Sequence, residues 1–380
     1  MAERPEATND MKIKSIQAHF VRIPFDMGAP VQEFAGLRFP TMDHLLVQVE
    51  TSDGLTGWGE GFGHSIIPAT KAALEAYVAP WFIGKDATDI NALHREAAQA
   101  FHIFGRNGPV VYAHSAIDIA LWDIAGKRAG LPLSDLLGGA RRKEVRAYAS
   151  LLRYGAPATV GRIASQMVER GFTHIKLHEH SVEAVKAARE GAGPGTAIMN
   201  DVNCPWSVAE AMQMERAYRA ANLYWLEEPV WPPEDHDGLA RVRKAGATRI
   251  AAGENAAGLH DFHDLFTKGA VDIAQPSVTK IGGITEMRKI IALAEAHSVE
   301  LVPHCAYFGP GNLASIHIAA SLATDTLLEN IYANLEASPY GDAMLARNGK
   351  VRVPSGPGLG IEPDMKIVEK YRQGPVGVVG

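Results

Sequence analysis

Cysteine, long apolar runs and clusters of basic residues are all scarce in this sequence of 380 residues. Its two cysteines, Cys204 and Cys305, form no CxxC pair, which argues against a disulfide framework and a structural zinc site and fits a reducing cytoplasm. No apolar stretch approaches the roughly 18 residues of a membrane span. The net charge is −6 and no Lys/Arg-rich run occurs, so neither nucleic acid nor a membrane is an expected partner. Residues 1–10 are polar, lack the apolar segment of a signal peptide, and are expected to be a disordered lead-in of a cytoplasmic protein.

Hydrophobic residues make up 47% of the chain, which is enough for a large core. Residues 12–61 alternate like strands around a predicted hairpin turn at Ser52–Gly54. Residues 66–137 carry apolar residues at helical spacing, and Gly138-Gly139 ends that pattern. Residues 11–140 are therefore predicted to form an N-terminal α+β domain.

The chain after residue 140 follows a different pattern. Short apolar runs alternate with longer amphipathic stretches, which is typical of βα units and predicts an α/β fold, a modified (β/α)₈-type (TIM-like) barrel, over residues 141–349. The eight predicted strands are 145–150, 174–178, 198–203, 224–227, 249–254, 271–275, 300–304 and 326–329. Residues 350–380 are too rich in Gly and Pro for a barrel helix, so we expect them to pack back against the N-terminal domain and complete a capping domain with it.

Ionisable residues recur at the predicted strand ends. Starting from Lys176, steps of 25, 26, 27, 26, 24 and 25 residues lead to Asp201, Glu227, Glu254, Lys280, His304 and Glu329. Catalytic residues of such barrels lie at the carboxyl ends of the strands, so this spacing predicts one rim of functional groups.

Three of these residues predict a metal site. Asp201, Glu227 and Glu254 end consecutive strands, and three converging carboxylates repel one another unless a cation neutralises them. The alternative is that each acid pairs with a neighbouring Lys or Arg. Oxygen-only ligands favour Mg²⁺, one ion per subunit, over zinc or copper.

Several segments resemble the mandelate racemase and muconate lactonizing branch of the enolase superfamily. Three segments of this chain look like the metal-ligand strand ends of that family: DVN (201–203), WLEEP (225–229) and AGEN (252–255). Two others, SAIDIALWDIAGK (115–127) and GPGLGIE (356–362), look like parts of its capping domain and of the C-terminal segment that returns to that domain. The resemblance runs from about residue 11 to the end of the chain.

The resemblance implies a set of roles. Asp201, Glu227 and Glu254 would bind Mg²⁺, Glu228 would lie beside them, and Asn203 would contact the metal-bound substrate. The substrate would be a small carboxylate, and the subunits would assemble as a homo-oligomer, a dimer or an octamer.

At the second strand the sequence departs from the family. Many members carry Lys-x-Lys there, with the second Lys as base, whereas this chain has Lys176-Leu177-His178. Strand alternation points His178 to the same side as Lys176. A His with a pKa of about 6.5 can serve as base or acid, or can merely hydrogen-bond the substrate. Lys176 would bind the substrate carboxylate and hold charge beside the metal.

The sixth and seventh strands mix two family patterns. His304 occupies the position of a His base, but Ser277 stands where the family pairs that base with an Asp. Lys280, followed by Gly282-Gly283, falls where lactonizing and epimerase members place a Lys base. Lys280 is thus a candidate base with His304 as acid, or His304 acts while Ser277 fixes its tautomer. The stretch from Lys280 to Gly283 could alternatively cradle a phosphate at a helix N-terminus.

Four further residues are candidates around the pocket. Glu329 falls where racemase-like members carry a Glu that hydrogen-bonds the substrate carboxylate; the alternative is a buried Glu satisfied by a Lys. Tyr307 is expected to shape the pocket and contact the substrate. His64 and Glu33 lie in N-terminal loops that, by the resemblance, cover the barrel mouth and select the substrate.

Together these residues predict an enzyme that removes the proton α to a carboxylate and stabilises the enediolate with a metal. Acid-sugar dehydratases resemble this chain, so dehydration of a sugar acid to a 2-keto-3-deoxy acid is the favoured prediction. Racemisation, epimerisation or cycloisomerisation of a related carboxylate is the alternative. A non-catalytic metal-binding barrel is the rival from another class of protein.

Overall fold

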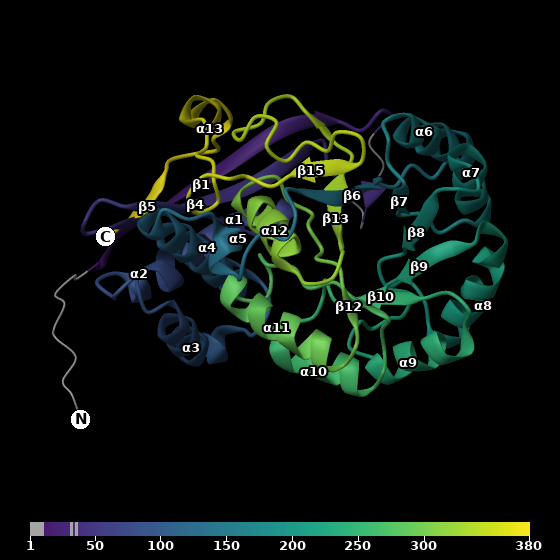
Figure 1. Ribbon diagram of the computed structural model, residues 1–380, viewed down its shortest axis with the longest axis horizontal. Coiled ribbons are helices and arrows are strands. Elements are labelled where there is room, and N and C mark those ends of the chain that lie inside the picture. The colour runs from purple at the N-terminus through teal and green to yellow at the C-terminus, as the bar shows by residue number, and fades with distance from the viewer. Residues whose placement is uncertain (1–10, 31–32, 35–36) are drawn as a thin grey trace.

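The computed structural model describes residues 11–30, 33–34 and 37–380. The expected disordered lead-in, residues 1–10, lies outside the described residues. Figure 1 shows a cap of strands and helices on one side and a ring of strands surrounded by helices on the other. Within the described ranges, no helix combines the length and apolar character needed to span a bilayer.

The cap contains an antiparallel sheet in which β4 pairs with both β1 and β5. Its long strands are β1 (Ile13–Asp26), β4 (Thr41–Thr51) and β5 (Thr56–Gly61). A separate short pair consists of β2 (Glu33–Phe34) and β3 (Leu37–Arg38). The predicted hairpin turn joins β4 to β5: Gly54 has a φ of 87°, and Thr51 Oγ1 donates a hydrogen bond to Asp53 Oδ1 at 2.5 Å.

The cap helices that precede the barrel in the chain lie on one side of this sheet (Figure 1). They are α1 (Ile67–Ala73), α2 (Ala79–Phe82), α3 (Ile90–Phe101), α4 (Pro109–Ala129) and α5 (Leu133–Leu136). Helix α4 is buried along most of its length and packs directly on β5. A Cβ on Gly59 would lie 1.8 Å from the Ala116 carbonyl oxygen, so only glycine lets the two backbones approach this closely.

Eight parallel strands form the barrel, one in each predicted position. They are β6 (Glu144–Ser150), β7 (His174–Leu177), β8 (Ala197–Asp201), β9 (Leu223–Glu227), β10 (Ile250–Ala252), β11 (Ile273–Ala274), β12 (Glu300–Leu301) and β13 (Leu327–Ile331). Spatial neighbours follow the chain order, and β13 lies beside β6. The two ends of this order are joined where Thr326 Oγ1 donates to the Leu301 carbonyl at 2.7 Å.

Side chains that point into the barrel form an inner core, which is separate from the larger core outside the barrel strands. This inner core consists of Tyr148, Met199, Trp225, Ala251, Ile273, Val302 and Leu327. Outside the ring lie α6 (Pro157–Glu169), α7 (Val182–Ala192), α8 (Val208–Tyr218), α9 (His236–Ala245), α10 (Leu259–Thr267), α11 (Ile284–Ala296) and α12 (Pro310–Ser321). The barrel is therefore filled by side chains, and its chemistry is confined to its ends.

The C-terminal segment returns to the cap, as predicted. Strand β15 (Lys350–Arg352) first pairs with β6 of the barrel. Beyond it, Leu359 donates its N–H to Asp123 of α4, and β16 (Gly377–Val379) pairs with β1. Helix α13 (Met365–Tyr371) packs on β1 as well, so the end of the chain belongs to the cap.

Candidate active site

A cavity of about 420 Å³ lies between the carboxyl ends of the barrel strands and the cap. Its barrel lining includes six predicted site residues, namely His178, Asn203, Glu254, Lys280, His304 and Glu329. The cap contributes mostly apolar side chains, among them Phe25, Met42 and Phe62. A larger hollow of about 770 Å³ near α9 and α10 is lined by none of the predicted site residues, and two of its charged residues, Arg243 and Asp272, form an ion pair.

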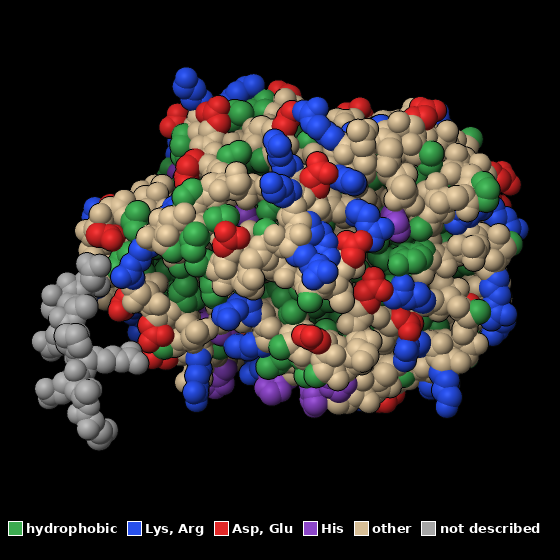
Figure 2. Space-filling view, in the orientation of Figure 1, with side chains coloured by type: hydrophobic (Ala, Val, Ile, Leu, Met, Phe, Trp, Pro, Cys, Tyr) green, Lys and Arg blue, Asp and Glu red, His purple; other side chains and the backbone are tan. Residues whose placement is uncertain are grey.

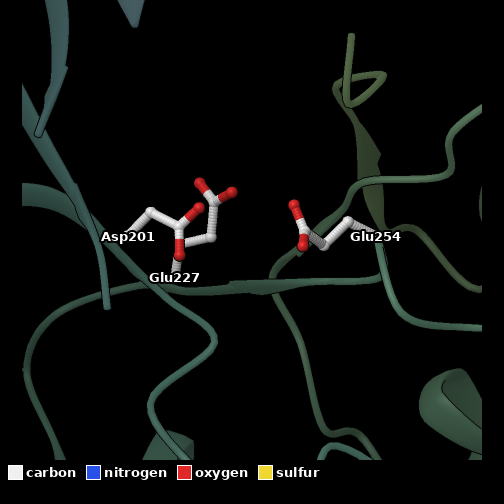
Figure 3. Close-up of side chains that lie close together, drawn as sticks. All are labelled: Asp201, Glu227 and Glu254. Carbon is white, nitrogen blue, oxygen red and sulfur yellow. The ribbon is translucent and has the colours of Figure 1, made fainter. Parts of the chain in front are cut away.

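Three carboxylates converge at the barrel mouth. Asp201 and Glu227 end β8 and β9, and Glu254 follows β10; each offers an oxygen within 4.8 Å of the others. In Figure 3 Asp201 and Glu227 lie side by side, and Glu254 points toward them from across the site. Burial and the neighbouring Asp201 raise the pKa of Glu227 well above its usual value. Oxygen donors that crowd together at such a cost fit a divalent cation.

Lys176 lies beneath this triad. Its Nζ is 2.8 Å from Glu227, 2.9 Å from Glu329 and 3.5 Å from Asp201. Burial opposes its charge, but Glu227 and Glu329 outweigh that effect and raise its pKa well above the usual value. Lys176 does not line the cavity, and its ammonium is paired with the carboxylates, so the contact with a substrate carboxylate stays a prediction.

His178 lies beside the same acids and lines the cavity, as strand alternation predicts. Its Nε2 is 3.3 Å from Asp201 Oδ2, and its Nδ1 is 2.5 Å from the Leu151 carbonyl oxygen. A carbonyl can only accept, so Nδ1 carries the hydrogen and the neutral ring has its lone pair on Nε2. Nε2 faces the Asp201 carboxylate at the edge of the cavity.

On the opposite side, His304 Nε2 lies 2.9 Å from Glu254 Oε2. Burial disfavours the charge of Glu254, but His304 and Lys280 outweigh it and hold its pKa well below the usual range. Lys280 Nζ lies 4.9 Å from the ring centroid of Phe62, and in the described part of the chain it forms no ion pair. Two nitrogen groups thus face the triad from this side.

The alternative in which Ser277 fixes the tautomer of His304 is wrong. Ser277 Oγ donates toward Tyr307 Oη at 3.4 Å, and His304 Nδ1 is buried without a hydrogen-bond partner among the described residues. Tyr307 in turn donates to the His304 carbonyl at 2.9 Å and does not line the cavity. Tyr307 thus supports the His304 backbone, and its contact with the substrate stays a prediction.

Glu329 lines the cavity but is already satisfied. Its two oxygens accept from Ser150 Oγ and the Cys305 N–H, both at 2.8 Å, and Oε1 also contacts Lys176. Burial opposes its charge, but Lys176 and His304 outweigh burial and lower its pKa to about 2. These contacts fit the alternative of a buried Glu paired with a Lys, and the hydrogen bond to a substrate carboxylate stays a prediction.

Asn203 and Glu228 both lie beside the acidic triad. Asn203 has a φ of 53°, donates its N–H to Asp201 Oδ1 at 2.9 Å, and lines the cavity. Its Oδ1 is buried with no hydrogen-bond partner in the described ranges, which leaves an acceptor for a ligand. Glu228 is buried and accepts from Asn255 Nδ2 at 2.8 Å.

Arg153 is a cavity residue that the sequence reasoning missed. It follows β6 by three residues, donates from Nε to the His178 carbonyl at 2.8 Å, and lines the cavity. The strand-end rule, applied to the first barrel strand as well as to the others, finds it. His64 also lines the cavity; burial, with His304 and Lys280 nearby, lowers its pKa to about 4. The side chain of Glu33 lies outside the described residues.

Comparison with known proteins identifies the class. Residues 24–138 match the N-terminal domain of mandelate racemase and muconate lactonizing enzyme, and residues 159–367 match the enolase C-terminal domain-like family. The chain therefore belongs to the mandelate racemase and muconate lactonizing enzyme branch of the enolase superfamily.

Its relatives have named activities. D-galactarolactone cycloisomerase of Agrobacterium fabrum is 35% identical, with 95% of this chain and 99% of that protein covered. Arabinonate dehydratase of Saccharolobus solfataricus is 31% identical, with 89% and 92% covered. The structure of L-talarate dehydratase from Polaromonas sp. JS666, complexed with Mg and L-glucarate, matches with a TM-score of 0.81 at 29% identity, covering 97% of this chain and 99% of that one. This protein is accordingly an enzyme, a lyase or isomerase of that superfamily.

Proposed function

We propose that this enzyme uses Mg²⁺ to remove the proton α to the carboxylate of an acid sugar and expels the β-hydroxyl as water, giving a 2-keto-3-deoxy acid. The observation that carries the proposal is the presence of titratable side chains on opposite sides of the acidic triad. His178 follows β7 and Lys280 follows β11, and these strands lie four apart in the ring of eight. That opposition supports removal of a proton on one face and delivery of a proton on the other.

The metal would be held by Asp201, Glu227 and Glu254. When bound, it supplies a Lewis acid that makes the hydrogen next to the substrate carboxylate more acidic. Lys176 keeps a positive charge against the triad from below. Asn203 Oδ1, buried without a protein partner among the described residues, would accept a hydrogen bond from the substrate.

His178 is the proposed base. The substrate proton passes to its Nε2, and the electron pair of the broken Cα–H bond forms the Cα=Cβ bond as the Cβ–O bond breaks. Lys280 is the proposed donor to the departing oxygen, because its ammonium lines the cavity next to the Phe62 ring and forms no ion pair among the described residues. Water leaves, and the enol product rearranges to the 2-keto acid. His304, bonded to Glu254, orients that carboxylate.

Cycloisomerisation is the second candidate, because the 35% identical relative is named a cycloisomerase. The same proton removal would then open a lactone or anhydro ring. The leaving oxygen would stay attached to the product, so that substrate and product would have equal mass.

One mass-spectrometric screen tests both candidates. The protein with Mg²⁺ is incubated in D₂O with aldonic acids, aldaric acids and their lactones. Loss of water with formation of a ketone supports the dehydratase. Deuterium uptake without loss of water supports the cycloisomerase or an epimerase. Absence of both reactions across the panel, with metal binding verified by calorimetry, contradicts the proposal.

We also propose a homo-oligomer, a dimer or an octamer, on the strength of the family resemblance. Size-exclusion chromatography with light scattering measures the mass directly. A monomer at micromolar concentration contradicts this part of the proposal.

A further inference from the structure

The loop that carries Lys280 is held by the cap as well as by the barrel. It runs from β11 to α11, and two side chains of the cap helix α4 accept its backbone N–H groups. Ser115 Oγ accepts from Gly282 at 2.9 Å, and Asp118 Oδ1 accepts from Thr285 at 3.0 Å. Both side chains are buried, and each contact joins residues 167 apart in the chain.

The two glycines of this loop allow the contact. Gly282 and Gly283 have φ angles of 104° and 89°, and a Cβ on Gly283 would lie 2.3 Å from Asp118 Oδ1. The N-terminal residue that flanks helix α11, Gly283, has no side chain that could accept a hydrogen bond from the first turn. Asp118 of the other domain accepts the Thr285 N–H of that turn instead. The alternative of a phosphate cradle here is therefore wrong, because protein side chains occupy these backbone donors.

The cap also contacts the Lys280 side chain and the next turn of the helix. Phe62, which follows β5, lies 4.9 Å from Lys280 Nζ. His94 of α3 contacts Glu286 of α11 at 3.1 Å. Asp118 Oδ2 is buried without a hydrogen-bond partner among the described residues and lies 3.7 Å from Nδ1 of the same His94, so a second cap side chain faces this carboxylate.

We propose that Ser115 and Asp118 are positioning residues: they fix the loop from Lys280 to Thr285 so that the Lys280 ammonium faces the substrate cavity opposite His178. The cap would then complete the active site by orienting a reacting group as well as by covering the cavity. The inference rests on the proposed function for the role of Lys280 in catalysis, but the position of Lys280 can be measured independently.

The first test observes that position without any substrate. Lysine labelled with ¹³C at Cε is incorporated, and the Lys280 signal is assigned with Lys280→Arg. Because Nζ lies near the Phe62 ring, the ring current should displace the neighbouring Cε–H signal upfield. Ser115→Ala and Asp118→Ala should lose this displacement. Asp118→Asn should keep it, because an amide oxygen still accepts the Thr285 N–H.

Asp123→Ala is the matched control. Asp123 is on the same helix and equally buried, and it accepts backbone N–H groups from Leu359 and Trp58 instead of the Lys280 loop. It should lower thermal stability and leave the Lys280 signal in place. An unchanged Lys280 signal in Ser115→Ala and Asp118→Ala overturns the inference, and if Asp118→Ala does not fold, Ser115→Ala alone decides.

The second test is kinetic and uses the substrate found in the D₂O screen. Asp118→Ala should lower kcat about tenfold to a hundredfold, since small misplacements of a catalytic group cost this much, with KM nearly unchanged. When Asp118→Ala is combined with Lys280→Ala, kcat should fall less than about twofold below that of Lys280→Ala alone, because the effects of residues that act through one group are not additive. Independent, multiplying losses would show that Asp118 does not act through Lys280. Full activity of Lys280→Ala would instead refute the catalytic role of Lys280. The ¹³C signal of Lys280 shows separately whether Ser115 and Asp118 position this side chain.

Discussion

Replacing Lys176 with methionine should leave the buried carboxylates under the cavity without the ammonium that they share. The ammonium lies within 2.8–3.5 Å of Glu227, Glu329 and Asp201, and none of these side chains is more than 2% exposed. Removing one partner of a buried ion pair costs about 3–5 kcal/mol. We therefore expect the free energy of unfolding, measured in EDTA, to fall by about this amount.

Two further features distinguish this loss from ordinary damage to the core. Without the lysine, the carboxyl groups have pKa values above those of the unfolded chain, so the folded state binds more protons and its stability falls as pH rises from about 5 to 8. A divalent cation replaces the missing charge, and at 100 times its Kd it stabilises the native state by about 2.7 kcal/mol. Mg²⁺ should consequently stabilise the variant more than the unchanged protein.

The assay is urea unfolding followed by circular dichroism at pH 5 and pH 8, with EDTA or with Mg²⁺. Lys268→Met is the control, because Lys268 pairs with Asp264 at 3.0 Å on the surface. An exposed pair of this kind contributes about 0–1 kcal/mol. The reasoning would be refuted if the two variants lost equal free energy of unfolding, or if the loss in Lys176→Met depended on neither pH nor Mg²⁺.

Three other predictions follow from the site and the core. Glu227→Gln should abolish Mg²⁺-dependent turnover while circular dichroism stays unchanged, and full activity would refute the metal assignment. His178→Asn keeps an N–H near the Leu151 carbonyl but removes the Nε2 lone pair, so kcat should fall about 10²–10⁴-fold; an unaffected rate would move the base to the other face. Burial lowers the pKa of His114 to about 3, so the unfolded state binds more protons below pH 6.5, and stability should fall by about 2 kcal/mol between pH 6.5 and 5. In His114→Phe the decrease, measured by urea unfolding, should be shallower, and an equally steep decrease would contradict the buried neutral state.

Much of the site could be predicted from the sequence, because a barrel converts regular spacing into proximity. Parallel strands of one ring end at the same edge, so acids one βα unit apart must meet there whatever the details of packing. This is why Asp201, Glu227 and Glu254 were identifiable without coordinates. Strand alternation likewise placed Lys176 and His178 on one side.

The partners of those residues could not be predicted in this way. Glu329, Tyr307 and Lys176 carry the right chemistry at the right rim, yet each is bonded to other protein groups, and of the three only Glu329 lines the cavity. Which way a side chain points within the rim depends on the neighbours that compete for its polar atoms. Strand spacing contains no information about that competition.

By itself, the sequence determined the number and order of the strands, the convergence of the three acids and the candidates for base and acid, because these follow from periodicities along the chain. The tertiary structure alone decided which candidates reach the substrate cavity. It also decided that the cap holds the Lys280 loop through Ser115 and Asp118, a contact between residues 167 positions apart. The physical reason is that hydrogen-bond satisfaction in a buried interface depends on which distant segments meet, and only the packed fold brings them together.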